Sequence, residues 1–414
     1  MDKPFFIDPV AGRIQHYSDL ISRLREDDQP HPLYCRELKA DAVFYRIVRS
    51  LILDLPIILL DSDFSDNEVA ALVPDAAELK REAPVSGLPD LPHSWEGIVA
   101  GFPDRSNWSI TLFTSGTTGI PKRVKHTFRS LTRAVQTGDH HRSSVWGFAY
   151  NPTHIAGLQV LFQALVNGNP LVDIFMSERQ VILDAIERYG ITHISATPTY
   201  FRLLLPVEQS FSGVQRITSG GERFDPKLMT AVGDMFPNAR VRNVYASTEA
   251  GTILAGTGEI FSADEAQRDF LRIVENELWI HRDLLGESPG LQLDAEWYHT
   301  GDMVEILQES PLTFRFLSRR NEMINVGGYK VNPHEVEDQL RELEGIVDAR
   351  VYGQTNSVVG NLLCCDIVTE QEGFPDDRTI RSALRERLQP FKVPRMIHRK
   401  AQLDHTRTGK LKRQ

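Results

Sequence analysis

Residues 111–126 read Thr-Leu-Phe-Thr-Ser-Gly-Thr-Thr-Gly-Ile-Pro-Lys-Arg-Val-Lys-His, and this stretch decides the fold. A short apolar run ends in a loop of small residues, whose backbone amides and hydroxyls can all face one anion. Gly116 and Gly119 permit positive φ and close backbone approach, and Lys122 adds a cation. The stretch predicts a strand followed by a polyphosphate-binding loop, with an ordinary Ser/Thr/Gly turn as the alternative. It lacks the spacing of the Walker P-loop.

The composition is that of a globular protein whose partners are small. Lys and Arg number 46 against 56 Asp and Glu, and this net charge of −10 argues against a nucleic-acid or anionic-membrane surface. Cys35, Cys364 and Cys365 have no metal-ligand spacing, which favours a reducing, cytoplasmic setting. No signal-peptide pattern opens the chain, and its most apolar window, 51–60, is too short to span a membrane.

Helix-like and strand-like segments alternate through the middle of the chain. Helices are expected over 14–25, 41–51, 126–136, 155–167, 179–189 and 226–235, and strands over 57–60, 97–100, 145–150, 170–175, 193–196, 213–218 and 239–245. This alternation predicts a doubly wound α/β sheet, in which ligands bind beyond the carboxyl ends of the strands. Polar loops follow two of these strands, at 219–222 and 246–249.

Two further parts are expected after this region. Short strands at 278–281, 297–299, 303–307 and 313–317 indicate a β-rich subdomain, and a polar stretch at 318–321 precedes a module with helices at 333–344 and 379–388. The predicted architecture is therefore α/β. A large N-terminal domain of doubly wound sheets plus the β-rich subdomain covers 1–317, and a small α+β C-terminal domain covers 318–414.

Five ordered motifs resemble those of the adenylate-forming superfamily, which includes acyl- and aryl-CoA ligases and carrier-protein adenylation domains. They extend over residues 108–414, and their order and spacing make the resemblance specific where a single motif would be weak. The resemblance implies an enzyme that joins a carboxylic acid to ATP as an acyl-adenylate with release of pyrophosphate. Transfer of the acyl group to a thiol would follow, with the small domain on a hinge.

The first two motifs resemble loops that hold ATP. The phosphate loop would hold the β- and γ-phosphates, and its residues are Thr114, Ser115, Gly116, Thr117, Thr118, Gly119 and Lys122. The second motif, Ser219-Gly220-Gly221-Glu222, resembles the loop that packs against adenine, where glycine lets a flat ring lie on backbone. Gly221 is assigned to the acid site as well.

The third motif, residues 243–249, resembles a segment that contacts both the nucleotide and the metal. By this resemblance Tyr245 stacks on adenine beside Ala246 and Ser247. Thr248 would bond the α-phosphate, and Glu249 would bind Mg²⁺, a hard cation that prefers carboxylate and phosphate oxygen.

The remaining motifs lie towards the C-terminus. Residues 298–302 resemble a segment whose aspartate, here Asp302, takes the ribose hydroxyls, and Arg319 would reach a ribose hydroxyl too. Lys410 resembles the family's mobile lysine, which neutralises the charge shared by the carboxylate and the α-phosphate. Asn321 marks the hinge about which the small domain would rotate between adenylate and thioester formation, exchanging Lys410 for the loop with Gly327 and Gly328.

The chain departs from the family pattern at several positions. Asn321 replaces the usual hinge aspartate, Asn325 the usual lysine and Ser318 the usual glycine. These changes bear on domain rotation and the thioester step more than on adenylation. Arg123 and Ala246 stand where glycine is common, which removes no phosphate-binding group. Because only 113 residues precede Thr114, a shortened N-terminal region is expected.

The acid site is expected within residues 150–157. No aspartate there can pair with a substrate ammonium, so the expected substrate is an aryl or acyl acid and not an α-amino acid. His154 resembles the residue that gates the acyl pocket in CoA ligases, with an ordinary loop histidine as the alternative. Asn151 could bond a ring hydroxyl, as in aryl-acid members.

The expected cofactors are ATP and Mg²⁺, with CoA or phosphopantetheine as thiol acceptor. The expected partners are a small-molecule carboxylic acid and, as a further candidate, an acyl carrier protein, with no nucleic acid and no membrane. Two alternatives stay open. One is a non-catalytic relative that binds an aromatic acid or a nucleotide, and the other is an enzyme that makes only the adenylate.

Overall fold

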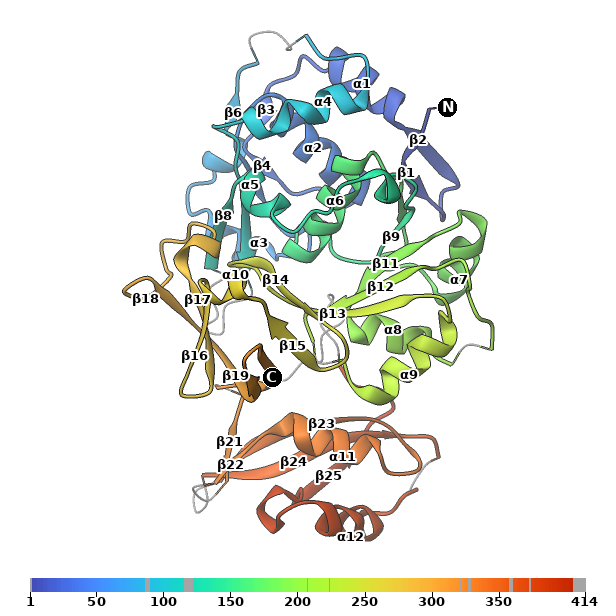
Figure 1. Cartoon of the computed structure of the whole chain (residues 1–414), viewed down its shortest axis with the longest axis vertical. Coiled ribbons are helices and arrows are strands. Elements are labelled where there is room, and N and C mark those ends of the chain that lie inside the picture. The colour runs from blue at the N-terminus through green and yellow to red at the C-terminus, as the bar shows by residue number, and fades with distance from the viewer. Residues whose placement is uncertain are drawn as a thin grey trace. The chain divides into compact units, whose positions relative to one another are not determined.

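The computed structural model describes residues 2–85, 90–114, 122–206, 208–222, 224–320, 322–326, 329–356, 360–371 and 374–404. The chain forms two compact units (Figure 1). The first contains Met1–Gly258 and Arg282–Gln292, and the second contains Glu259–His281 and Leu293–Gln414. Residues 115–121, Asn321, Gly327, Gly328 and Lys410 lie outside the described residues.

An eight-stranded sheet forms one half of the first unit, with the order β14-β13-β12-β11-β9-β10-β1-β2. The inner strands from β13 to β1 are parallel, and the edge strands β14 and β2 are antiparallel to their neighbours. The strands are β1 Pro4–Asp8, β2 Arg13–His16, β9 Trp146–Phe148, β10 Leu171–Asp173, β11 His193–Ala196, β12 Arg216–Gly220, β13 Arg240–Ser247 and β14 Gly251–Gly256.

Helices cover both faces of this sheet, which confirms the predicted doubly wound α/β architecture. On one face α7 (Arg179–Arg188), α8 (Pro198–Leu204) and α9 (Pro226–Met235) share a core with β11 and β12 (Figure 1). On the other face α6 (Ile155–Asn167) packs against β9. The burial of both faces explains why these strands read as apolar runs without alternation.

A second sheet of the first unit carries the strands on either side of the phosphate-loop motif. Its order is β4-β5-β7-β8, in which β8 is antiparallel to β7 and the other neighbours are parallel. Thr114, the last residue of β7, lies opposite Lys122, the first residue of β8, so the two strands that flank the phosphate-loop motif form an antiparallel pair. The strands of this sheet are β4 Tyr34–Cys35, β5 Ile57–Leu59, β7 Ile110–Thr114 and β8 Lys122–His126. A separate pair is formed by β3 His31–Pro32 and β6 Glu82–Ala83.

Amphipathic helices complete the core of the first unit. The central helix, α2, buries most of its residues against α6 and the aromatic side chains of β1 and β9. The α-helices are α1 Tyr17–Glu26, α2 Ala40–Ile52, α3 Asp66–Leu72, α4 Trp95–Ala100 and α5 Phe128–Thr132, and the 3₁₀ helices of this unit are η1 Glu78–Lys80, η2 Phe102–Asp104, η3 Asp139–His141 and η4 Arg282–Leu284. No helix among the described residues is long and apolar enough to cross a membrane.

The second unit contains two antiparallel-rich sheets. The first has the order β15-β20-β19-β17-β16, with β18 paired to β19, and confirms the predicted β-rich subdomain. The second has the order β22-β21-β24-β23, with β25 parallel to β24, and α11 and α12 pack on it around Val336, Leu340 and Ile380 (Figure 1). Its elements are β15 Ile260–Ala263, α10 Glu265–Arg268, β16 Leu271–Val274, β17 Glu277–His281, β18 Leu293–Asp294, β19 Trp297–Glu309, β20 Leu312–Arg319, β21 Ile324–Val326, β22 Tyr329–Val331, α11 Pro333–Arg341, β23 Ile346–Asn356, β24 Gly360–Thr369, α12 Asp377–Arg387, η5 Pro390–Lys392 and β25 Met396–Arg399.

Four local predictions were wrong, each for an identifiable reason. Residues 97–100 form the end of α4 and not a strand, because Ser94 caps the helix by accepting a hydrogen bond from Gly97 N. The helix expected over 126–136 is limited to α5, since His126 pairs with Ile110 as the end of β8. The helix expected from Ile14 begins at Tyr17, after β2. The strands expected at 297–299 and 303–307 are one continuous strand, β19.

The predicted boundary between residues 317 and 318 falls inside the second compact unit. The β-rich subdomain, which the prediction assigned to the N-terminal domain, groups by its contacts with the C-terminal module. A hinge at residues 318–321 thus stays a prediction.

Candidate active site

The two polar loops that follow β12 and β13 lie side by side at the carboxyl edge of the eight-stranded sheet. Parallel pairing places Ser219 opposite Ala196 on one side and Asn243 on the other, and Gly220 opposite Val244. Tyr245 to Glu249 continue from that point. The edge where several parallel strands end is the usual ligand position in open α/β sheets. The predicted adenine loop and the predicted metal-binding segment are therefore neighbours.

Glycine is required in the first of these loops for two reasons. Gly221 has φ of +85°, a backbone conformation that side chains with a Cβ rarely adopt. A Cβ on Gly220 would lie 2.9 Å from the carbonyl oxygen of Val244, which is too close for an undisturbed contact. The loop can therefore approach the neighbouring strand closely, as the prediction of a ring packed on backbone requires.

Glu222 is tied to the start of α8. Its Oε2 atom accepts hydrogen bonds from the backbone N of Thr199 at 3.1 Å and from the Thr199 hydroxyl at 2.6 Å. Its other carboxylate oxygen, Oε1, is buried without a hydrogen-bond partner in the described part of the chain. Glu222 therefore joins the adenine loop to α8, and Oε1 is the atom through which its predicted ligand contact would be made.

The backbone of Thr248, Glu249 and Ala250 is held by three separate donors. His126 Nε2 lies 2.7 Å from the Thr248 carbonyl oxygen, Gly286 N donates to the Glu249 carbonyl at 2.6 Å, and Arg133 Nη2 donates to the Ala250 carbonyl at 2.5 Å. The side chains of Thr248 and Glu249 make no hydrogen bond or ion pair with any residue that the structure describes. The main chain is thus fixed while the two predicted catalytic side chains are left for a ligand.

Glu249 fits the role of a Mg²⁺ ligand. Its carboxylate is half-buried and makes no hydrogen bond or ion pair with a described residue. Within that same part of the chain, no group of three or more His, Cys, Asp or Glu side chains could hold a metal ion unaided. Mg²⁺ commonly binds through one or two carboxylates together with phosphate oxygens and waters, so a lone carboxylate beside a phosphate site suits it.

Sequence reasoning missed His126, Arg133 and Gly286. The position of His126, at the end of the strand that leaves the phosphate loop, is a sequence signal for a buried histidine between sheet and helix. In the structure His126 is 2% exposed. Arg133 and Gly286 carry no comparable signal, because the bond from Arg133 to Ala250 and the close approach of Gly286 to His126 both join residues far apart in the chain.

The predicted acid-site residues His154 and Asn151 share one carboxylate, which was not predicted. His154 Nε2 lies 3.0 Å from Asp61 Oδ2, and Asn151 Nδ2 donates to the same oxygen at 2.8 Å. The side-chain amide oxygen of Asn151, Oδ1, accepts from both the backbone N and the hydroxyl of Thr153, at 2.9 and 2.8 Å. Asn151 is 3% exposed. The contact of Asn151 with a substrate stays a prediction. It would use the second hydrogen of the Nδ2 amide group, because the first is donated to Asp61 and Oδ1 accepts from Thr153.

The predicted ribose-binding residues of the second unit lie together. Asp302 on β19 is opposite Arg319 on β20, and Arg319 Nε donates to Asp302 Oδ1 at 3.0 Å. Thr300 fixes the segment, because its hydroxyl donates to the Leu278 carbonyl at 2.6 Å and accepts from Asp302 N at 3.0 Å. The pairing orients the Asp302 carboxylate, whose contact with a ribose stays a prediction.

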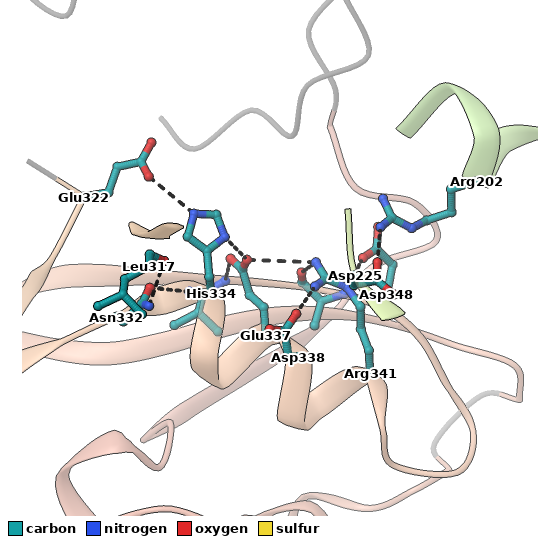
Figure 2. A network of polar contacts seen from close by, with 12 residues as sticks. Arg202, Asp225, Leu317, Glu322, Asn332, His334, Glu337, Asp338, Arg341 and Asp348 are labelled. Atoms are coloured by element: carbon teal, nitrogen blue, oxygen red, sulfur yellow. Dashed lines mark hydrogen bonds and ion pairs between the residues drawn. The ribbon is translucent and has the colours of Figure 1, made fainter. Parts of the chain in front are cut away.

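A polar network lies on the C-terminal side of the predicted hinge (Figure 2). His334, at the start of α11, has its Nε2 3.4 Å from Glu322 and its Nδ1 3.4 Å from Glu337. Glu337 is buried and also accepts from Val351 N at 2.9 Å. Arg341 then pairs with Asp348 at 2.9 Å. The residue next to Asn321 is thus connected through His334 to the sheet of the C-terminal module.

The sites above can be compared with known proteins. A doubly wound sheet with glycine-containing loops at the carboxyl ends of its strands is typical of nucleotide-binding proteins. The model of the AMP-binding enzyme family matches residues 37–270, more than half of the chain, and that of the AMP-binding enzyme C-terminal domain matches residues 335–410. The chain belongs to the AMP-binding enzyme family, which confirms the predicted membership of the adenylate-forming superfamily.

Curated relatives match about three quarters of the chain. Bacitracin synthase 3 of Bacillus licheniformis is 26% identical over 74% of this chain and 5% of its own length. 4-Hydroxybutyrate–CoA ligase 1 of Metallosphaera sedula is 27% identical over 73% of this chain and 61% of its own length. 2-Succinylbenzoate–CoA ligase of Staphylococcus epidermidis is 26% identical over 73% and 68%. The chain therefore spans less than two thirds of the length of the first two.

Solved structures share the fold across nearly the whole chain. ATP-bound MatB from Rhodopseudomonas palustris has a TM-score of 0.78 at 16% identity, covering 99% of this chain and 94% of that one. O-succinylbenzoate coenzyme A synthetase from Bacillus subtilis, in complex with ATP and magnesium ion, has a TM-score of 0.72 at 19% identity, covering 99% and 95%. At these identities the structures establish the fold alone.

Proposed function

We propose that this protein activates a carboxylic acid with Mg²⁺ and ATP to an acyl-adenylate, releases pyrophosphate and passes the acyl group to the thiol of CoA. One observation carries the proposal. The main-chain carbonyls of Thr248, Glu249 and Ala250 are held by three hydrogen bonds at the carboxyl edge of the sheet, and the side chains of Thr248 and Glu249 make no hydrogen bond or ion pair with a described residue. Family membership and the CoA ligases among the relatives support it.

The reaction needs positioning and charge neutralisation more than covalent help from the protein. The substrate carboxylate attacks the α-phosphorus in line, a P–O bond to the acyl oxygen forms, and the bond to the β-phosphate oxygen breaks so that pyrophosphate leaves. Thr248 would donate to an α-phosphate oxygen, and Lys410 would stabilise the charge shared by carboxylate and phosphate. Bound Mg²⁺, held by Glu249, would neutralise charge on the phosphate oxygens.

The proposed substrate is an aryl or acyl acid. No carboxylate within residues 150–157 is available for the ammonium of an α-amino acid. Asp61, an acid that contacts this segment, is engaged by His154 and Asn151. Two of the relatives are ligases of 4-hydroxybutyrate and 2-succinylbenzoate, which are carboxylic acids without an amino group.

Acid-dependent exchange of labelled pyrophosphate into ATP tests the proposal across a panel of aryl, acyl and amino acids. Lys410→Ala should abolish the exchange while the thermal unfolding temperature stays unchanged, and Lys412→Ala, two residues further on, serves as the matched control. Full exchange in the Lys410→Ala variant would refute the assignment of Lys410. Absence of exchange with every acid, combined with a thermal shift by acid or nucleotide, would support a non-catalytic binding protein instead.

The acceptor is tested separately, because Asn321 and Asn325 depart from the family pattern in the segment assigned to domain rotation. Thioester formation with CoA supports the proposal, and thioester formation only with a phosphopantetheine-bearing carrier protein would assign that partner. Exchange without either thioester would indicate an enzyme that makes only the adenylate. Cytoplasmic location is part of the proposal and follows from the reducing setting that the cysteines favour.

A further inference from the structure

Residues 282–292, here called the strap, belong to a different unit from the chain on either side of them. β17 before the strap and β18 after it are strands of the second unit, whereas the strap itself packs in the first unit. A segment that leaves its own sheet for eleven residues and returns must gain its stabilisation from the contacts it makes outside that sheet. Those contacts fall on two predicted parts of the ATP site.

The first contact is with the strand that leaves the phosphate loop. Lys125 and Glu287 exchange two backbone hydrogen bonds, of 2.8 and 2.9 Å, so the strap adds a short antiparallel bridge to the free edge of β8. Lys125 Nζ also donates to Glu287 Oε2 at 2.6 Å. β8 begins at Lys122, directly after the loop, so the strap is fixed to the base of the predicted phosphate site.

The second contact is with the main chain of the predicted metal-binding segment. Gly286 N donates to the Glu249 carbonyl at 2.6 Å. Arg133 bridges the two pieces, with one nitrogen on the Leu284 carbonyl at 3.1 Å and the other on the Ala250 carbonyl at 2.5 Å. The strap therefore connects β8 and the Glu249 backbone through one residue, Gly286, and its neighbour Glu287.

His126 completes the arrangement from the side of β8. It is 2% exposed, and burial lowers the pKa of its imidazole. Because Nε2 faces a carbonyl oxygen, which can only accept, that nitrogen carries the proton and donates to Thr248 at 2.7 Å. Three successive carbonyls, from Thr248 to Ala250, thus each meet a different donor.

Gly286 is the one residue of the strap whose side chain must be absent. A Cβ there would lie 2.8 Å from His126 Cε1, 2.8 Å from the Lys125 carbonyl oxygen and 2.9 Å from Val124 Cγ1. Its φ is not in the left-handed region, so the requirement is steric and not conformational. An added methyl group would therefore separate the strap from His126, and with it from the Thr248–Ala250 main chain.

We infer that the strap, with Gly286 at its centre and with His126 and Arg133 on either side, is a positioning device. It sets the Thr248 hydroxyl and the Glu249 carboxylate at a fixed distance from the phosphate-loop hairpin. The inference rests on the proposed function, because it assigns these two side chains to Mg·ATP. Gly286, His126 and Arg133 touch neither substrate nor metal in this assignment, so they act through the backbone that they hold.

The test compares Gly286→Ala with Gly290→Ala, a matched control in the same strap, where a Cβ meets nothing within 4 Å. Gly286→Ala should raise the Mg²⁺ concentration for half-maximal exchange about tenfold and lower kcat about tenfold or more, with the KM for the acid unchanged. Calorimetric affinity for Mg·ATP without acid should fall in parallel. Gly290→Ala should match the wild type. Equal behaviour of the two variants would overturn the inference.

Two further measurements separate positioning from loss of fold and from failure of the proposed function. His126→Gln keeps an N–H donor near Thr248 and should restore most of the affinity for Mg·ATP that His126→Leu loses; equal loss in both would contradict the role given to the donor. Hydrogen exchange of peptides covering 248–252 and 282–292 should accelerate in Gly286→Ala but not in Gly290→Ala. The hydrogen-exchange result does not depend on turnover, so it can be obtained even if no acid supports the exchange of pyrophosphate into ATP. A wild type that binds no Mg·ATP would overturn both proposals.

Discussion

The carboxylate of Glu277 joins Arg320 to Gly301, the residue of β19 that precedes Asp302. Glu277 Oε2 lies 2.9 Å from Arg320 Nη2, and Oε1 accepts from Gly301 N at 2.7 Å. Arg320 N also donates to the Gly301 carbonyl at 2.7 Å. Glu277 is buried, and a buried carboxylate is costly unless paired and hydrogen-bonded. The residue that precedes the predicted hinge is therefore anchored to the predicted ribose site.

Replacing Glu277 by Gln should weaken the contacts of this residue without removing all of them. The amide oxygen can still accept from Gly301 N, whereas the ion pair with Arg320 is lost, so we expect a loss of about 1–2 kcal/mol in the free energy of unfolding. Because Gly301 and Asp302 on β19 would be held less firmly, the KM for ATP should rise. Urea denaturation and ATP saturation curves measure both effects. A variant with unchanged stability and an unchanged KM would show that Glu277 anchors nothing of consequence.

Glu249→Gln should lower kcat/KM for ATP by about 10²–10³-fold, since it removes a carboxylate assigned to Mg²⁺ while keeping the size of the side chain. The loss should be partly recovered at high Mg²⁺ concentration. The free energy of unfolding should change little, because the Glu249 side chain makes no hydrogen bond or ion pair with a described residue. Glu178→Gln, on the exposed start of α7, is the control. If the activity of Glu249→Gln depended on Mg²⁺ concentration as that of the wild type does, Glu249 would not be a ligand of the metal.

Asp61→Asn should affect the acid and not the nucleotide. The carboxylate orients His154 and Asn151 together, and the loss of such a charge-assisted contact is worth about 1–2 kcal/mol. The expected result is a KM for the acid raised by about tenfold, with the KM for ATP unchanged. Initial rates with each substrate varied in turn provide the measurement. Equal changes in both KM values would place Asp61 in the fold and not in the acid site.

Asp173, at the end of β10, should make stability depend on pH. Burial, followed by the nearby negative charges of Asp8 and Asp41, raises the pKa of its carboxyl to about 7. The folded protein then holds the proton more tightly than the unfolded chain, so this contribution is complete below the unfolded pKa near 3.8 and is lost as the pH rises through about 7. Asp173→Asn should therefore gain about 2 kcal/mol over the wild type between pH 5 and pH 8. Urea midpoints at the two pH values test this, and a constant difference would contradict it.

The nucleotide edge of the sheet could be predicted from sequence because its signals are local. Apolar runs of strand length end in Ser219-Gly220-Gly221-Glu222 and in residues 245–249, and parallel pairing then brings the two loops together. The same locality explains the failure at residues 97–100, where a short apolar run resembles a strand although Ser94 caps a helix. A sequence window weighs such signals one at a time.

The contacts that hold the site could not be predicted, because each joins residues distant in the chain. Asp61 contacts both predicted acid-site side chains, and it lies about ninety residues before them in the chain. Gly286 has no room for a Cβ because of His126, which lies in a distant part of the chain. Periodicity gives the elements and the ends of strands, whereas these partners depend on how the elements meet.

The strap also limits how the protein can be divided or made. The first unit is interrupted by residues 259–281, which belong to the second. A ribosome releasing the chain would therefore produce the donor for Glu249 only after the strands β15 to β17 of the other unit had emerged. A fragment that ends at Gly258 would lack Gly286 and Glu287, and a cut after Gln292 would separate β17 from β19. No single break in this region leaves both units whole, so each unit is complete only when the chain is continuous through residues 258–293.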